Sequence, residues 1–261
     1  MVEFSVGTVI EKQILTVEIQ KNMPPSFSII IPVYNRPKAV LQAIDSVLRQ
    51  SYDGNFEVIV VDDGSTDDTW DVVTRLAECD HRISGVRYED NRGRIAARNR
   101  GMQEARETFA LWLDSDDELY SGFLENFADC LSKNPEVRLA TCGAAVYNDK
   151  SHSFHTREAF APLAGTLFRS GKIGTGSFVF RREDYVELPE SRHPYGGPDS
   201  FSGLVQEKYP EIAALYGKNE SGSFLPLGNC WGDDYVEFFL LTRKNDAVAI
   251  NMPLYVQHVR P

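Results

Sequence analysis

Short apolar runs that end in polar residues, with a helical pattern after each, constrain the fold of this chain most. The clearest runs cover residues 27–33, 56–61 and 110–113. Uninterrupted apolar runs of this length are typical of parallel strands buried on both faces. Their alternation with helices through short loops predicts an α/β fold. We expect a mainly parallel, doubly wound, Rossmann-like sheet with helices on both faces and a smaller C-terminal part.

The polar residues that follow these runs are expected to share one edge of the sheet. Right-handed crossovers place the loops after parallel strands on the same rim, and open α/β sheets bind ligands there. Tyr34, Asp62, Asp63 and the stretch Asp114–Asp117 should therefore converge on one cleft.

Three carboxylates, Asp114, Asp116 and Asp117, come directly after the run 110–113. Burying several unpaired carboxylates is very costly, so we expect them at the edge of the sheet rather than in the core. An Asp-x-Asp pair in that place can hold a hard divalent cation, and the cation can in turn hold phosphates. The alternative is an acidic loop that caps the next helix.

The rest of the chain has a weaker pattern. A β-branched stretch within residues 6–19 predicts a strand or hairpin before a short proline linker. The helix after the second apolar run is expected to be capped by Thr66 or Asp67. The remaining expected elements are a third strand at 86–88, a helix after 91, a helix over 123–131, a strand over 137–147, a Gly-rich turn entering a strand at 174–180, a long loop over 189–230, a helix after Trp231 and an extended segment over 247–259.

Composition and charge exclude some classes of protein. The net charge of −11 argues against a protein that coats nucleic acid, but it is compatible with a nucleotide ligand. The four cysteines contain no C-x-x-C pair, so neither a zinc site nor a disulfide framework is expected. No apolar run approaches the roughly 18 residues of a membrane span, and the first residues lack a secretory pattern. We expect a cytoplasmic protein without an integral membrane segment, either free or associated peripherally with the inner face of the membrane.

Four stretches in one order resemble the motifs of the family 2 glycosyltransferases. They are IPVYNR at 31–36, VDDGSTD at 61–67, LDSDD at 113–117 and GDD at 232–234. The resemblance is firm over residues 26–131 and loose beyond. The family comprises inverting enzymes of the GT-A fold that use nucleotide-diphosphate sugars. The resemblance therefore implies metal-dependent transfer of a sugar, from a UDP-sugar by default, to an acceptor hydroxyl.

The first two stretches match the part of the family that binds the nucleotide base. Pro32 and Tyr34 match its base-binding loop, with Arg36 beside them, and a tyrosine ring can stack on any nucleobase. Asp63 matches the acidic residue that accepts a hydrogen bond from the ring N–H of uracil. The alternatives are an ordinary tyrosine at a strand end and a turn in which Asp and Gly have their usual roles.

The third stretch matches the residues that meet ribose and metal. The resemblance implies that Asp114, with Ser115, contacts ribose, that Asp116 binds Mn²⁺ or Mg²⁺, and that Asp117 only helps to orient them. It also implies that His258 completes the metal shell, although a single histidine near a terminus is often incidental.

Two arginines near the start of the third helix, Arg94 and Arg98, can meet a diphosphate together with the helix N-terminus. A solvated surface arginine is the alternative for each. The fourth stretch resembles the family's Glu-Asp pair, with Asp233 in place of the glutamate. Asp234 then corresponds to the general base that takes the proton of the acceptor hydroxyl. A helix cap is again the alternative.

These matches imply a division of one GT-A domain. Residues 1–25 form an N-terminal extension, residues 26–135 the half that binds the nucleotide sugar, and residues 136–261 the half that binds the acceptor and carries the base. Aromatic residues between 184 and 231 suit a carbohydrate, lipid-linked or small-molecule acceptor. A binding protein that kept the fold and lost catalysis, and a nucleotidyltransferase, are the other readings.

Overall fold

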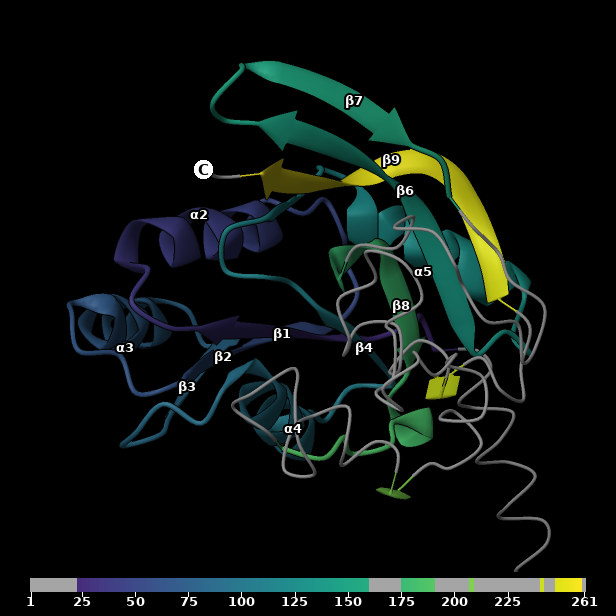
Figure 1. Ribbon diagram of the computed structural model, residues 1–261. Helices are drawn as coiled ribbons and strands as arrows, with labels where there is room; N and C mark the ends of the chain where they lie inside the picture. Colours follow the sequence, from purple (N-terminus) through teal and green to yellow (C-terminus); the bar gives the residue numbers. More distant parts are fainter. Residues whose placement is uncertain (1–22, 160–174, 191–206, 209–239, 242–246, 260–261) are drawn as a thin grey trace, which may run out of the picture.

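A computed structural model describes residues 23–159, 175–190, 207–208, 240–241 and 247–259 (Figure 1). Within these residues, nine strands join one sheet in the order β3-β2-β1-β4-β8-β6-β9-β5, and β7 pairs with β6. The predicted strand or hairpin near the N-terminus, most of the loop over 189–230 and the start of the helix after Trp231 lie outside the described residues. Asp233 and Asp234 lie outside them as well.

The first half of the sheet is parallel, as predicted. β1 pairs with β2 and β4, and β2 pairs with β3, all in parallel. The predicted connecting helices are present between these strands. The bounds are β1 Phe27–Val33, α2 Pro37–Leu48, β2 Phe56–Asp62, α3 Thr69–Cys79, β3 Ile83–Arg87, α4 Arg94–Glu104 and β4 Phe109–Trp112.

Successive residues of the central strands point into different cores. Ile29 and Ile31 of β1 pack in a core with residues of α2, α3 and α5. Ile30 of β1 packs in a second core with Ala97 and Met102 of α4. Figure 1 accordingly shows α2 and α4 on opposite sides of these strands. Burial on both faces explains why these strands are continuous apolar runs, since neither face meets water.

The second half of the sheet is mixed, so the expectation of a mainly parallel sheet holds only for β1 to β4. β8 is antiparallel to β4 and β6, β7 is antiparallel to β6, and β5 is antiparallel to β9, whereas β6 and β9 are parallel. Strands β6, β7 and β9 form a curved layer (Figure 1). The bounds are β5 Glu118–Leu119, α5 Phe123–Lys133, β6 Leu139–Asn148, β7 Ser153–Arg157, η1 Thr175–Ser177, β8 Phe178–Arg181, η2 Arg182–Asp184 and β9 Ala247–Val259.

Most of the elements expected in this half are confirmed. The helix over 123–131, the strand over 137–147, the strand at 178–180 and the extended segment over 247–259 are all present. The sequence did not predict β5 and β7. β5 has only two residues, and β7 is largely exposed, so neither carries an apolar run.

Candidate functional site

A pocket of about 450 Å³ lies at the carboxyl ends of the parallel strands. It has contributions from the loops after β1, β2 and β4, from the start of α4 and from the end of β9. Ten of the residues that the sequence singled out line it, whereas Asp62 and Arg98 do not. The ten are Pro32, Tyr34, Arg36, Asp63, Arg94, Asp114, Ser115, Asp116, Asp117 and His258. The sequence did not single out five further lining residues, Val33, Asn91, Gly93, Ala97 and Gln257.

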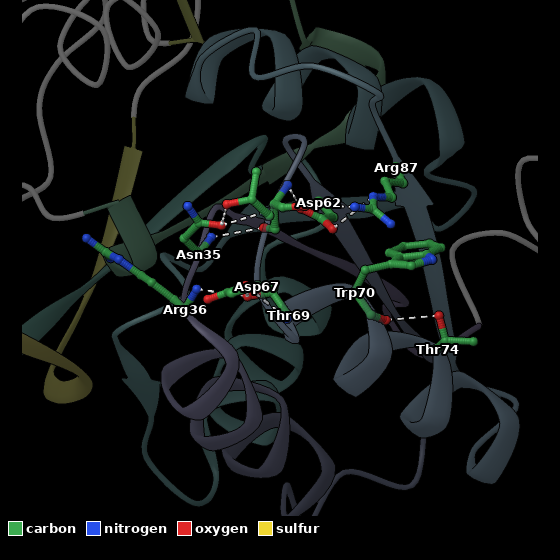
Figure 2. A network of polar contacts seen from close by, with 10 residues as sticks. Asn35, Arg36, Asp62, Asp67, Thr69, Trp70, Thr74 and Arg87 are labelled. Carbon is green, nitrogen blue, oxygen red and sulfur yellow. Dashed lines mark hydrogen bonds and ion pairs between the residues drawn. The ribbon is translucent and has the colours of Figure 1, made fainter.

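The loop after β1 is fastened to the loop after β2 through Asn35 (Figure 2). Asn35 adopts a left-handed backbone conformation with φ of 52°, which asparagine tolerates better than most residues. Its backbone N–H donates to Ser65 Oγ at 2.9 Å, and its Oδ1 accepts the backbone N–H of Thr66 at 2.8 Å. These bonds fix the turn that presents Tyr34 and Arg36 to the pocket.

A second set of bonds holds the backbone of Arg36. Its N–H donates to Thr69 Oγ1 at 2.9 Å, and both the backbone N–H and the hydroxyl of Thr69 donate to Asp67 Oδ1. Neither Thr66 nor Asp67 is the N-cap residue of α3, because Asp68 occupies that position without a side-chain cap bond. Asp67, one of the two residues expected to cap the helix, nevertheless accepts the N–H of its first residue, Thr69. The Arg36 side chain extends away from this network in Figure 2.

Asp62 does not reach the pocket, so its expected place in the cleft is wrong. Its carboxylate is fully buried, accepts the backbone N–H of Ser65 at 2.8 Å and lies 3.5 Å from Nε of Arg87. The Arg87 guanidinium also lies over the ring of Trp70 (Figure 2). Asp62 is the last residue of β2, and successive strand residues point in opposite directions, so only Asp63 faces the pocket.

Asp63 joins the loop after β2 to the loop before α4. Its two carboxylate oxygens accept the backbone N–H groups of Arg92 at 2.7 Å and Gly93 at 2.8 Å. Gly64 has φ of 75°, and a Cβ there would lie 2.6 Å from the backbone carbon of Asp90. Each carboxylate oxygen has more than one lone pair, so these bonds leave Asp63 able to accept from a ligand as well.

The two arginines of α4 have different surroundings. Arg94, the first residue of the helix, lines the pocket. Arg98 is buried, donates to Asp114 Oδ1 at 3.3 Å and lies over the ring of Trp112. The alternative of a solvated surface arginine is therefore wrong for Arg98. It supports Asp114 from behind the pocket wall.

The carboxylates of the Asp-x-Asp stretch each face an arginine. Asp114 faces the buried Arg98, whereas Asp116 lies 2.5 Å from the guanidinium of Arg36, whose side chain remains 49% exposed. The pairs link the loop after β4 to α4 on one side and to the loop after β1 on the other.

Asp117 lies at the expected edge of the sheet, where it lines the pocket, but it is nearly fully buried there. Its carboxylate accepts a hydrogen bond from the Tyr255 hydroxyl and another from the backbone N–H of His258 at 2.8 Å. Burial, and then the nearby charge of Asp114, raise the pKa of Asp117 to about 8. A buried carboxyl group that favours its neutral form avoids much of the cost of burying a charge.

His258 lies between two acidic side chains at the end of β9. Its Nε2 is 3.1 Å from Glu118 Oε1, and its Nδ1 is 3.3 Å from Asp149 Oδ1. Its ring also contacts the ring of Tyr147 edge-on. Pairing of β9 with β5 and β6 thus brings a residue from the end of the chain to the Asp-x-Asp loop.

The chemistry of these donors fits a divalent cation. Four aspartates and the His258 imidazole line one pocket, and Asp116 already attracts a cationic guanidinium there. Metal-bound histidines commonly donate a hydrogen bond from the second ring nitrogen to a carboxylate. Either Glu118 or Asp149 can accept that bond, and the other would have to give up its ring nitrogen to the metal. In the part of the chain that the structure describes, however, no three acidic, histidine or cysteine side chains are already gathered as a ligand set. Arg36 would have to give up Asp116 to a metal.

Among the described residues, no helix has both the length and the apolar composition to span a membrane.

The chain belongs to glycosyl transferase family 2, because the model of that family matches residues 28–191. An uncharacterised glycosyltransferase of Haemophilus influenzae is 38% identical over 42% of this chain and 44% of its own length. The putative teichuronic acid biosynthesis glycosyltransferase TuaG of Bacillus subtilis is 38% identical over 40% of this chain and 41% of its own. The chain therefore spans less than half the length of these curated relatives.

Solved structures confirm the GT-A type of fold. The crystal structure of Staphylococcus aureus TarS in complex with UDP-GlcNAc resembles this chain with a TM-score of 0.60. The likeness covers 90% of this chain and 59% of that one, at 18% identity. A TarS complex with UDP has a TM-score of 0.58. At this identity the likeness concerns the fold.

Proposed function

We propose that this chain is a metal-dependent, inverting glycosyltransferase that moves a sugar from a nucleotide-diphosphate sugar to an acceptor hydroxyl. The observation that carries the proposal is the convergence of Tyr34, Asp63, Arg94 and the Asp-x-Asp carboxylates on one pocket. They come from separate loops, and together they offer an aromatic face, a hydrogen-bond acceptor, a phosphate-binding cation and oxygen ligands. Membership in the family supports the reaction class.

UDP is the nucleotide that the pocket suits best. Tyr34 is exposed and can stack on the base, and Asp63 can accept the ring N–H of uracil. Arg94 lines the pocket and, with the N-terminal N–H groups of α4, would bind the diphosphate. Ser115 and Asp114 would contact the ribose. The UDP complexes of a protein with a similar fold support this choice.

The reaction needs a base and a stabilised leaving group. Asp234 takes the proton of the acceptor hydroxyl as the acceptor oxygen attacks the anomeric carbon opposite the diphosphate. The bond from that carbon to the diphosphate breaks with its electron pair, and the configuration inverts. Asp116 and His258 would hold Mn²⁺ or Mg²⁺, which when bound draws negative charge from the departing diphosphate. The acceptor is a carbohydrate, a lipid-linked sugar or a small molecule.

Turnover of sugar nucleotides by the full chain tests this proposal. A screen of UDP-sugars for hydrolysis or transfer should find one that is consumed, and EDTA should abolish its consumption. Asp234→Asn should lower the rate by about 10²–10⁴-fold, the usual contribution of a general base, and leave UDP binding unchanged. Asp129→Asn, at an exposed carboxylate on α5, is the control and should leave the rate unchanged.

Three outcomes would contradict parts of the proposal. Full activity of Asp234→Asn would remove Asp234 as the base. Indifference to EDTA would remove the metal. Binding of UDP without turnover of any sugar nucleotide would favour a binding protein that kept the fold and lost catalysis.

A further inference from the structure

The Arg36 guanidinium occupies the position at Asp116 where a cation would bind, with Nη1 and Oδ2 2.5 Å apart. We propose that Arg36 neutralises Asp116 until nucleotide and divalent cation arrive together, and that it then moves to the diphosphate. Arg36 would thus couple the binding of the two ligands. The inference rests on the proposed function, because that function supplies the diphosphate and the cation.

The side chain of Arg36 can leave Asp116 without disturbing the fold. Its loop is held by backbone bonds, since the Arg36 N–H donates to Thr69 Oγ1. The side chain itself is half exposed, and an ion pair of this kind is weak because water screens it. Exchange is therefore compatible with an intact pocket.

The neighbouring pair provides the contrast. The guanidinium of Arg98, opposite Asp114, is 2% exposed and lies over the buried ring of Trp112. Asp114 itself is 33% exposed, but taking it away from Arg98 would leave a buried guanidinium without its opposite charge, so this pair resists exchange. Of the two Asp-x-Asp carboxylates, Asp116 is thus the one whose arginine can be replaced by a metal.

The same pocket offers Arg36 a second partner. Arg36 and Arg94 both line it, and a guanidinium binds phosphate oxygens through paired hydrogen bonds. A divalent cation at Asp116 would repel the guanidinium, whereas a diphosphate attracts both. A cation that binds alone must therefore displace Arg36 from Asp116 without giving the guanidinium a new partner. A cation that arrives with a diphosphate offers the guanidinium phosphate oxygens in exchange. Positive coupling between the two ligands follows.

Binding of Mn²⁺ and of UDP to Arg36→Gln tests the inference with two readouts of opposite sign. Free Mn²⁺, followed by electron paramagnetic resonance without nucleotide, should show an affinity about threefold to fivefold higher than in wild type, the range expected for a partly exposed ion pair. Calorimetry with saturating Mn²⁺ should show UDP binding weakened by at least about threefold, because a charged phosphate contact is lost. A merely structural role of Arg36 would weaken both.

Two further variants complete the design. Arg49→Gln breaks an exposed pair of the same length, 2.5 Å to Asp45 on α2, and should change neither affinity. Arg36→Lys keeps the charge without the paired donors, so Mn²⁺ should bind as in wild type while UDP binds more weakly. Arg36→Lys also serves as the test if Arg36→Gln does not fold.

The inference and the proposed function fail in different ways. Unchanged or weaker Mn²⁺ binding by Arg36→Gln, or Mn²⁺ binding by neither protein, would overturn the inference. Failure of wild type to bind UDP with Mn²⁺ present would contradict the proposed function. Normal UDP binding by wild type, together with unchanged Mn²⁺ binding by Arg36→Gln, would overturn the inference alone.

Discussion

The hydroxyl of Tyr255 donates a hydrogen bond to the buried carboxylate of Asp117. This bond joins the Asp-x-Asp loop to β9, a strand that comes more than a hundred residues later in the chain. The neighbouring backbone N–H of His258 donates to the same carboxylate. Asp117 therefore holds the wall that carries His258 against the loop that carries Asp116, which is a larger structural role than the expected helper of the other carboxylates.

Replacing Tyr255 by phenylalanine should destabilise the protein. The change leaves the ring in place but removes a buried donor to a carboxyl group, which costs about 1–3 kcal/mol. Urea denaturation measures the loss of unfolding free energy. Tyr147→Phe is the control, because the Tyr147 hydroxyl makes its bond to His152 at an exposed site. Equal unfolding free energies for the two variants would contradict the role given to Tyr255.

Replacing Gly64 by alanine should cost more stability than replacing Gly122. Both glycines have positive φ, 75° and 86°, so each substitution carries the left-handed strain of roughly 1–2 kcal/mol. A Cβ at Gly122 meets only the Asn126 amide at 3.4 Å, whereas one at Gly64 meets backbone at 2.6 Å. The free energy of unfolding of Gly64→Ala should therefore fall by more than about 2 kcal/mol. The substitution should also weaken UDP binding, because the loop before α4 must move. Similar losses in the two variants would show that close packing of these loops is unimportant.

The stabilisation from Asp80 should disappear at low pH. Hydrogen bonds from Arg82 at the turn between α3 and β3 lower the pKa of Asp80 to about 2. Because the pKa is lower in the folded state, the Asp80 carboxylate stabilises the protein at pH values above the unfolded pKa of about 3.9. This stabilisation is lost as the pH falls towards the folded pKa. Because the pair is partly exposed, Asp80→Asn should cost only about 1 kcal/mol at pH 7.

Urea unfolding of wild type and Asp80→Asn across this range checks the pH dependence. The difference in unfolding free energy between the two proteins should be constant from neutral pH down to about pH 5. It should shrink as the pH falls from about 4 towards 2. A difference that stays constant to the acid end would mean that the Asp80 carboxylate does not provide the stabilisation.

The sequence predicted the parallel half of the fold and most of the pocket, because the signals there are local. Apolar runs marked β1, β2 and β4, and polar residues that follow these runs line the pocket, among them Tyr34, Asp63 and Asp116. Contacts between distant segments were not predictable in this way. Nothing near Asp117 in the sequence shows that Tyr255 will cover it, and nothing near Asp116 shows that Arg36 will pair with it.

Asp62 and Asp63 show a second limit of sequence reasoning. The two residues are chemically identical neighbours, yet one is buried under Arg87 and the other lines the pocket. The exact end of β2 decides which of them faces the ligand, and strand boundaries are the least certain part of a sequence pattern. The alternation along the strand, once its end is known, assigns them correctly.

The central claim, that the pocket binds a nucleotide through Tyr34, is tested most directly by calorimetric titration of UDP with Mn²⁺ into wild type, Tyr34→Ala and Tyr120→Ala. The two tyrosines are similarly exposed, 43% and 46%, but only Tyr34 lines the pocket. Loss of a stacked base costs about 1–3 kcal/mol, so Tyr34→Ala should bind UDP about fivefold to a hundredfold more weakly while Tyr120→Ala binds like wild type. UDP affinity that is unchanged in Tyr34→Ala, or equally reduced in both variants, would contradict the account.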